Sequence, residues 1–285
     1  MTAGDFELAM IGGPWGRRLA PRRGWIDELP WGEVLPGDAD GARVVWTRTA
    51  FSEYASAAAF AEIAAALLAC GAPIDLVAAA GDFVVDEIVH TEAAARVAGA
   101  LGGAVALVVD LQRLVRPPVA ADPLVRAAEL LVRTSCVGEA LTVPILKLSR
   151  QLAGSALIDA VLERVVADES SHAQIGWWFL DWAGPRLDDD DRAHLGRVAG
   201  AAIRAFAPLV AAGCEGGTSG LGALGCDRYD PALAEAAVRR VARPLAERAI
   251  DVPRDDLVAV GAEVASLGSP ELEGDPVSST AAASR

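Results

Sequence analysis

The sequence of 285 residues is 53% hydrophobic and 22% charged, with a formal net charge of −14. This composition is typical of a soluble globular protein with an ample core, and the length allows one large helical domain or two small ones. The negative charge argues against nucleic acid as a partner, because phosphates attract basic surfaces. It does not exclude a small-molecule substrate.

No segment is expected to cross a membrane or to direct export. The longest stretch without a charge, residues 97–109, has 13 residues and includes three glycines, so it is too short for a span. The N-terminal residues lack the basic start and apolar run of a signal peptide. Four cysteines at irregular spacing do not form a disulfide framework, so we expect a cytoplasmic protein with reduced thiols.

Residues 1–46, called the leader below, contain several prolines and glycines and are expected to be irregular. Four of the seven tryptophans lie here: Trp15, Trp25, Trp31 and Trp46. Aromatic rings gain stability by burial, so the leader should lie across the helical part of the protein. It would serve there as a surface cover or as a lid over a substrate entrance.

Alanine-rich runs with helical periodicity follow the leader. Residues 48–70 predict a first helix, and a break at residues 70–73 separates it from a second helix over 73–100. Residues 104–122 have the length of a crossover between parallel helices. The pair Asp122-Pro123 then reads as the N-cap and first residue of a third helix.

The third helix contains two poor helix formers, Gly138 and Pro144, on either side of Glu139. Pro144 lacks a backbone donor and crowds the carbonyl of Ala140, so a kink or a π-bulge is expected there. A small-residue break at residues 153–155 precedes a fourth helix that runs to about residue 182.

The remainder predicts two further helices and a tail. An acidic cluster at 188–191 should open a fifth helix to about residue 211, and His194 in this exposed turn is not counted as a ligand. A glycine-rich loop between Cys214 and Cys226 reads as a linker, with a contact between these cysteines left open. A sixth helix should span about 230–250. From Gly268 the chain is rich in Ser, Ala, Gly and Pro and is expected to be disordered.

One pentapeptide pattern occurs twice. Residues 86–90 read Asp-Glu-Ile-Val-His and residues 168–172 read Asp-Glu-Ser-Ser-His, in a chain with three histidines. Residues three apart lie on one face of a helix, so each glutamate points the same way as its histidine. The two pairs are Glu87 with His90 and Glu169 with His172.

Each pair has a matching glutamate on the preceding helix. Glu53 lies about as far before the break near residue 71 as Glu87 lies after it, and Glu139 and Glu169 flank the break at 153–155 in the same way. Antiparallel helices would bring these groups to equal depth. Glu62 is the competitor of Glu53, but it is too near the turn and half a rotation away.

Mixed carboxylate and imidazole ligands suit iron or manganese. Four carboxylates inside an apolar bundle would be protonated or would destabilise the fold if unpaired. Two divalent ions would neutralise them, and two neutral imidazoles would complete the coordination. A four-helix bundle builds a two-metal site from this ligand set, which here is Glu53, Glu87, His90, Glu139, Glu169 and His172.

These residues resemble the ferritin-like di-iron carboxylate superfamily over about residues 47–184. The resemblance implies an all-α, ferritin-like four-helix bundle with a long crossover between helices two and three. Two additional C-terminal helices over 185–252 and a partly disordered tail over 253–285 would complete the chain. In this superfamily the aspartate before each Glu-x-x-His hydrogen-bonds the histidine of the opposite motif, which gives Asp86 and Asp168 that role. The alternative interpretation of Asp86 and Asp168 is that they are solvated acidic residues on the helix surface.

The resemblance implies two Fe ions, or Mn and Fe, with O2 as co-substrate. We favour an oxidase or oxygenase that oxidises a small organic substrate and receives electrons from an external donor. A homodimer is left open. Cys136 and Thr142 are candidates for its pocket wall or for core-filling residues. The alternatives are a ferroxidase or other iron-handling protein, and a metal-binding bundle without an organic substrate. Ala94 stands where radical-generating members carry a tyrosine, and Val165 where N-oxygenases often carry a further histidine.

Overall fold

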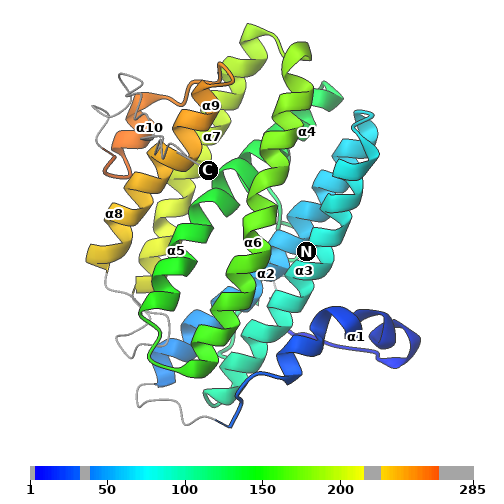
Figure 1. Cartoon of the computed structure of the whole chain (residues 1–285), viewed down its shortest axis with the longest axis vertical. Coiled ribbons are helices and arrows are strands. Elements are labelled where there is room, and N and C mark those ends of the chain that lie inside the picture. Colours follow the sequence, from blue (N-terminus) through cyan, green and yellow to red (C-terminus); the bar gives the residue numbers. More distant parts are fainter. Residues whose placement is uncertain (1–3, 33–38, 215–225, 263–285) are drawn as a thin grey trace, which may run out of the picture.

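The computed structural model describes residues 4–32, 39–214 and 226–262, and this part of the chain is almost entirely helical (Figure 1). The elements before the third long helix are β1 (Gly4–Asp5), α1 (Gly13–Asp27), α2 (Ala39–Ala69), α3 (Ile74–Ala100) and β2 (Val108–Val109). They are followed by α4 (Pro123–Leu131), the π-helix η1 (Val132–Glu139), α5 (Ala140–Gln151), α6 (Ala156–Ala183) and the 3-10 turn η2 (Gly184–Arg186). The last elements are α7 (Asp189–Cys214), α8 (Cys226–Ala236), the π-helix η3 (Ala237–Ala242), α9 (Arg243–Ala246) and α10 (Arg254–Val258).

Helices α2 and α3 form an antiparallel hairpin, and Gly71 makes its turn. Gly71 has φ of +65°, which an L side chain adopts only with strain. Its N–H donates to the carbonyl of Leu68, and the N–H of Ala72 donates to the carbonyl of Leu67. These two bonds are those of a Schellman motif, which satisfies the last carbonyls of α2. The turn therefore fixes how far each residue of α2 lies from its partner on α3.

The third long helix is continuous over α4, η1 and α5. Asp122 caps its start by accepting hydrogen bonds from the N–H groups of Leu124 and Val125, as predicted. The expected distortion is also present. It is a π-helix of eight residues that ends at Glu139, so it lies upstream of Pro144 instead of around it.

The crossover between α3 and α4 runs along the bundle and is held by a buried carboxylate. Glu129 accepts hydrogen bonds from the N–H groups of Val119 and Ala120, both at 2.8 Å. Earlier in the crossover, β2 pairs antiparallel with β1 of the leader, with Gly4 opposite Val109. This short ribbon joins the leader to the connection between the two helix pairs.

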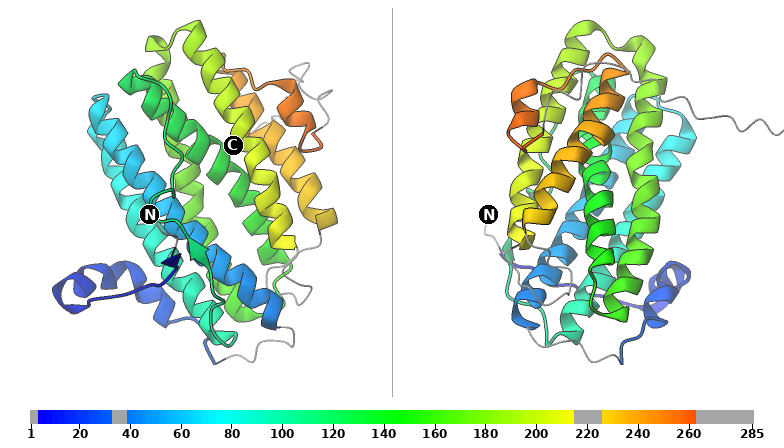
Figure 2. Two further views of the ribbon diagram at one scale, coloured as in Figure 1. Left: turned by 180° about the vertical axis from the view of Figure 1, so that it is seen from behind. Right: turned by 60° about the vertical axis from the view of Figure 1, so that its left-hand side comes forward.

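The long helices form three neighbouring layers in Figures 1 and 2: α2 with α3, then the α4–η1–α5 helix with α6, then α7 with α8 and α9. The largest buried cluster includes residues of all three layers, such as Phe60, Leu131, Phe179 and Leu195. A second cluster, around Trp46 and Leu157, fills the end of the bundle near the start of α2.

Several predicted boundaries differ from the structure. The leader is not irregular throughout, because α1 forms with Pro14 in its first turn, where a missing N–H costs nothing. The first bundle helix begins at Ala39 and includes Trp46, well before residue 48. The sixth helix is continuous over α8, η3 and α9, and α10 lies within the predicted tail. The side chains of Cys214 and Cys226, and residues 263–285, lie outside the described residues.

One helix in the described part, Asp40–Ala69, is long and apolar enough to cross a membrane by length and composition. It packs against α3 and α4 and carries Glu53 toward the bundle interior. A single weakly apolar helix is weak evidence for a membrane protein, because bundle helices of soluble proteins have the same composition.

Candidate metal centre

Six chemically matched side chains converge in the middle of the bundle from four helical segments. One glutamate comes from α2, a Glu-His pair comes from each of α3 and α6, and the last residue of η1 supplies the fourth glutamate. All are buried except Glu53, whose side chain is 14% exposed. They are the residues that the sequence singles out: Glu53, Glu87, His90, Glu139, Glu169 and His172.

His90 lies at the centre of the first group. Ligand atoms of Glu53, Glu87, His90 and Glu169 all lie within 4.8 Å of one another, so this group could hold a metal ion. The Nδ1 atom of His90 is 3.2 Å from Glu169 Oε1, 3.8 Å from Glu87 Oε2 and 4.0 Å from Glu53 Oε2.

His172 stands in the same relation to a second group. Its Nδ1 atom lies 2.9 Å from Glu87 Oε1 and 3.0 Å from Glu169 Oε2. Glu139 completes this group, where it interacts electrostatically with Glu169, Glu87 and His172. Glu87 and Glu169 therefore face both histidines, whose ring centroids are 6.1 Å apart. Two carboxylates shared between two imidazoles, with one further carboxylate beside each, is the donor set of a two-metal site.

An aspartate lies behind each histidine, on the ring edge away from the glutamates. Asp168 Oδ2 is 3.2 Å from Nε2 of His90, and Asp86 Oδ2 is 3.5 Å from Nε2 of His172. Each aspartate thus faces the histidine of the opposite motif, but only Asp168 makes the hydrogen bond that the resemblance implies, because Nε2 of His172 has no hydrogen-bond partner. Such a contact orients the imidazole and directs Nδ1 toward a metal.

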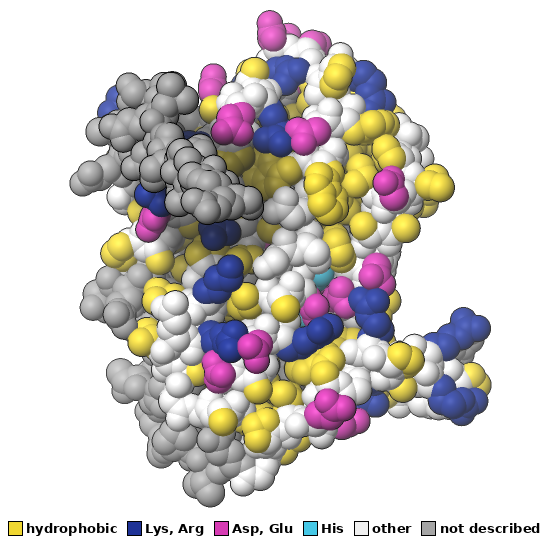
Figure 3. Space-filling model, viewed as in Figure 1, with side chains coloured by type: hydrophobic (Ala, Val, Ile, Leu, Met, Phe, Trp, Pro, Cys, Tyr) yellow, Lys and Arg dark blue, Asp and Glu magenta, His cyan; other side chains and the backbone are white. Residues whose placement is uncertain are grey.

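Each of these aspartates is in turn paired with an arginine. Arg164, one helical turn before Asp168 on α6, lies 3.2 Å from it. Arg22 of α1 donates to both Asp86 and Asp82 of α3. Figure 3 shows basic and acidic side chains gathered beside one another on the face that carries α3 and α6. The leader therefore contributes to the site through Arg22.

Electrostatics in the site favour bound cations of some kind. Burial, with the charges of Glu87 and Glu169, raises the pKa of Glu53 well above its ordinary value. Burial and the same two charges act likewise on the pKa of Glu139. Burial by itself would lower the pKa of His172, but its close contacts with the carboxylates of Asp86, Glu169 and Glu87 raise it to about 12.

The same balance raises the pKa of His90 well above its ordinary value: burial opposes the change, and contacts with Asp168, Glu169 and Glu87 outweigh it. Without metal, the site therefore holds protons on both imidazoles and on some of its carboxylates. Metal ions would take the place of these protons.

The donor atoms also have unused capacity. Among the described residues, both carboxylate oxygens of Glu87 and Nδ1 of His90 are buried without a hydrogen bond of proper geometry. Buried polar atoms are nearly always hydrogen-bonded, because leaving one unsatisfied costs about 1–3 kcal/mol. A coordinated ion would satisfy all three atoms, so the residues present fit a metal.

The remaining candidates lie outside this cluster. Glu62 is exposed, as its position near the turn predicts. His194 does not lie in an exposed turn but on α7, where Nε2 is 2.8 Å from Glu129 Oε1. Cys136 is fully buried against Gly176 of α6, and its neighbour Ser135 donates to the carbonyl of His172. Thr142, on α5, is partly buried.

Four further side chains of the site are not among the residues that the sequence singles out. Arg164 has a local signal, its i, i+4 spacing from Asp168, which could have been found. Arg22 has none, because 64 residues separate it from Asp86. Phe60 and Phe83 are also new: their rings pack on that of His172 with centroids 5.2 and 4.3 Å away, and they exclude water from it.

Comparison with known proteins adds no assignment. No family model matches the chain, and neither the curated proteins nor the solved structures contain a match. The site is therefore interpreted from its own chemistry.

Proposed function

We propose that the protein is a di-metal oxidoreductase of the ferritin-like type that uses O2 to oxidise a small organic molecule. The observation that carries the proposal is the convergence of four carboxylates and two imidazoles, with an aspartate behind each imidazole. When bound, two iron ions, or one manganese and one iron, would supply the electrons that reduce dioxygen.

The chain's own residues would have distinct roles in this chemistry. Glu87 and Glu169 would help to hold the metal beside each histidine, because each of them faces both histidines. Glu53 and Glu139 would each bind at one position. The aspartates would keep Nδ1 of each imidazole directed inward, and the aromatic rings around His172 would keep bulk water away.

The π-helix η1 favours substrate oxidation over iron storage. A straight α-helix packed by small side chains leaves little room beside the metals, whereas a π-helical segment displaces the backbone locally. Here the π-helix ends at Glu139, and the two residues before it, Val137 and Gly138, line a cavity of about 440 Å³ whose wall includes none of the six ligands. That volume lies in the range of small-molecule sites. A ferroxidase needs only a narrow path for ions.

Two roles of the leader, a surface cover and a lid over a substrate entrance, are compatible with this proposal. Residues 8–12 cover a second cavity of about 660 Å³, whose wall includes Tyr54, Ile88 and Thr91, each next in sequence to a proposed ligand. This position suits a lid. The packing of Ile26 against Val89 and Ala93 of α3 suits a fixed cover.

The test is anaerobic reconstitution with ferrous ion, followed by metal analysis and dioxygen uptake. We expect two metal ions per chain and uptake of O2 by the reduced protein. Glu87→Ala should lose both, and Glu62→Ala, an exposed glutamate on α2, should lose neither. Light scattering on the same sample tests the alternative, because a storage protein should form a large hollow assembly. Fewer than one metal ion per chain under these conditions would contradict the proposal.

A further inference from the structure

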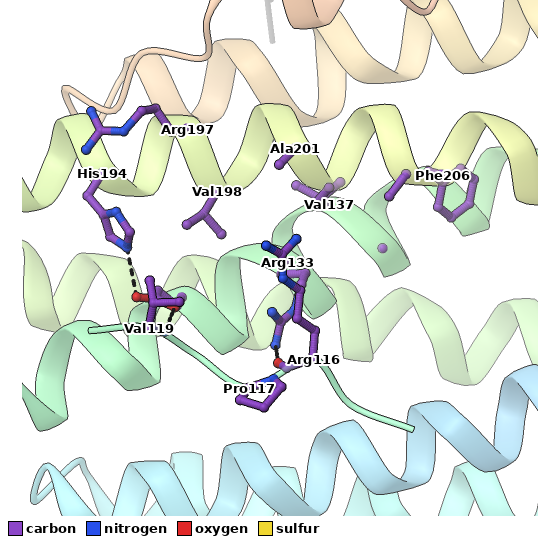
Figure 4. A pocket seen from close by; sticks show the side chains of 14 residues that line it. Arg116, Pro117, Val119, Arg133, Val137, His194, Arg197, Val198, Ala201 and Phe206 are labelled. Carbon is purple, nitrogen blue, oxygen red and sulfur yellow. Dashed lines mark hydrogen bonds and ion pairs between the residues drawn. The ribbon is translucent and has the colours of Figure 1, made fainter. Parts of the chain in front are cut away.

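A cavity separate from the metal centre lies where the crossover, η1 and α7 meet. Its volume is about 440 Å³, and Figure 4 shows the side chains that surround it. The crossover supplies Arg116, η1 supplies Arg133, and α7 supplies Arg197 and Phe206. In the figure, Arg116 and Arg133 lie beside each other near the middle of the cavity, while His194 and Phe206 lie toward opposite ends.

The charges around this cavity are not balanced. Within the described part of the chain, no carboxylate lies within ion-pair distance of Arg116, Arg133 or Arg197. The one acidic side chain in the wall, Glu129, is already occupied by His194 and by two backbone N–H groups of the crossover. Three cations thus gather around one cavity of a protein whose formal net charge is −14.

The arginines are also held close to one another at different depths. Arg133 is half-buried and donates a hydrogen bond to the carbonyl of Arg116, which fixes its position. Burial and the charge of Arg116 lower the pKa of Arg133, and the more distant charges of Glu129 and Glu62 oppose this change only in part. Arg116 and Arg197 are exposed at the mouth. An anion at Arg133 would relieve the repulsion between the neighbouring guanidinium groups of Arg133 and Arg116.

The rest of the wall is apolar. Val137, Val198, Ala201 and Phe206 face the cavity together with several further small side chains. A bare inorganic anion would leave this surface without a partner. A guanidinium group matches a carboxylate through two parallel hydrogen bonds, and the apolar wall matches a hydrocarbon or aromatic body. From this combination we infer that the cavity binds a small organic carboxylate with an apolar body.

The cavity and the metal centre share η1 as a wall. Val137 and Gly138 line the cavity, and Glu139, the next residue, belongs to the ligand cluster. The bound carboxylate would therefore lie against the segment that carries a metal ligand. The identification of this carboxylate as the substrate that the metal centre oxidises rests on the proposed function. The binding of a carboxylate in the cavity does not rest on it.

The experiment measures binding to the metal-free protein by isothermal titration calorimetry. The ligands are 2-naphthoate and the neutral 2-naphthamide, which has nearly the same shape. We expect the Kd of naphthoate to be at least about tenfold lower than that of naphthamide. Hydrogen bonds to charged groups contribute about 1.5–3 kcal/mol, and each 1.4 kcal/mol is a factor of ten in Kd. Inorganic phosphate should compete poorly, since it leaves the apolar wall uncovered.

Substitutions assign the effect to this cavity. Arg133→Gln should weaken naphthoate binding about tenfold and leave naphthamide binding unchanged. Arg116→Gln and Arg197→Gln, at the exposed mouth, should each weaken it about two- to fivefold, and less at high salt. Arg126→Gln is the matched control, because Arg126 is an exposed arginine on α4 outside the cavity.

Equal binding of naphthoate and naphthamide would overturn the inference, as would unchanged naphthoate affinity in all three cavity variants. If Arg133→Gln disturbs folding because it releases the crossover, the two mouth variants still decide the question. A different result would refute the proposed function without refuting the carboxylate cavity. Protein that binds naphthoate through these arginines but holds no metal would keep the carboxylate cavity and refute the di-metal oxidoreductase.

Discussion

Metal binding should stabilise the fold, and Glu87→Ala should remove that gain. The native site brings together donor atoms from four helical segments, whereas the unfolded chain scatters them. A ligand that binds only the native state adds RT ln(1 + [L]/Kd) to the free energy of unfolding. Ferrous or manganous ion at 100 times its Kd should therefore add about 2.7 kcal/mol for each site that it fills.

The size of the protein converts this free energy into a shift of Tm. An unfolding entropy of about 2.1 cal/mol/K per residue gives about 0.6 kcal/mol/K for 285 residues. The expected rise in Tm for each filled site is then about 4–5 °C at 100 times Kd and about 7 °C at 1,000 times Kd. The gain should be larger at pH 8 than at pH 6. The raised pKa values of His90 and His172 keep protons on the metal-free site, and metal binding must release them.

Differential scanning calorimetry under nitrogen, with and without metal, measures the shift. Glu87→Ala should show no increment, because one carboxylate oxygen of Glu87 faces His90 and the other faces His172. Glu62→Ala should keep the full increment, since that side chain is exposed on the same pair of helices. If the metal-free and metal-loaded proteins melt at one temperature at saturating metal, the interpretation of the buried carboxylates is wrong.

Three further predictions concern the surroundings of the site. Asp168→Asn should weaken metal binding about 10–100-fold in a competitive titration, because it frees the ring of His90, while Glu163→Gln on the exposed side of α6 should not. Gly176→Ala should lower the free energy of unfolding in urea by about 1–3 kcal/mol, because its Cβ would come within 2.5 Å of a side chain of η1. Gly81→Ala, at an open helix position, should instead raise it by about 0.5–1 kcal/mol. Burial opposes ionisation of Glu129, but hydrogen bonds from His194 and the crossover lower its pKa below 4.5. Glu129→Gln should therefore cost about 1–3 kcal/mol at pH 7, and the difference from wild type should shrink as the pH falls through that lowered pKa.

A specific result would refute each of these three predictions. Equal metal affinity of Asp168→Asn and wild type would mean that the aspartate is a solvated helix acid. A fully stable Gly176→Ala would mean that α6 and η1 can separate without cost. A Glu129→Gln deficit that stays constant from pH 7 to acidic pH would exclude ionisation of this carboxylate as its cause.

The sequence alone singled out the six side chains that converge, because the spacing within each helix and across each helix turn is local. Three-residue spacing on a helix aligns Glu87 with His90 whatever the surrounding fold. The turn at Gly71 sets the depth of α2 against α3, so it selects Glu53 over Glu62. Capping by Asp122 is equally local, since its partners are the next two N–H groups. The helical class of the protein and the distortion before Pro144 also follow from residues close together in the chain.

Only the tertiary structure decided what reaches the site from a distance. Arg22 meets Asp86 because α1 packs on α3, and nothing within either helix indicates that contact. The arginine cavity likewise needs the crossover, η1 and α7 at one place, which no periodicity encodes. The proline and glycine content of the leader predicts an irregular chain, yet Pro14 falls in the first turn of α1, where a helix tolerates it. Local geometry follows from covalent spacing, but contacts between distant segments depend on how the whole core is filled.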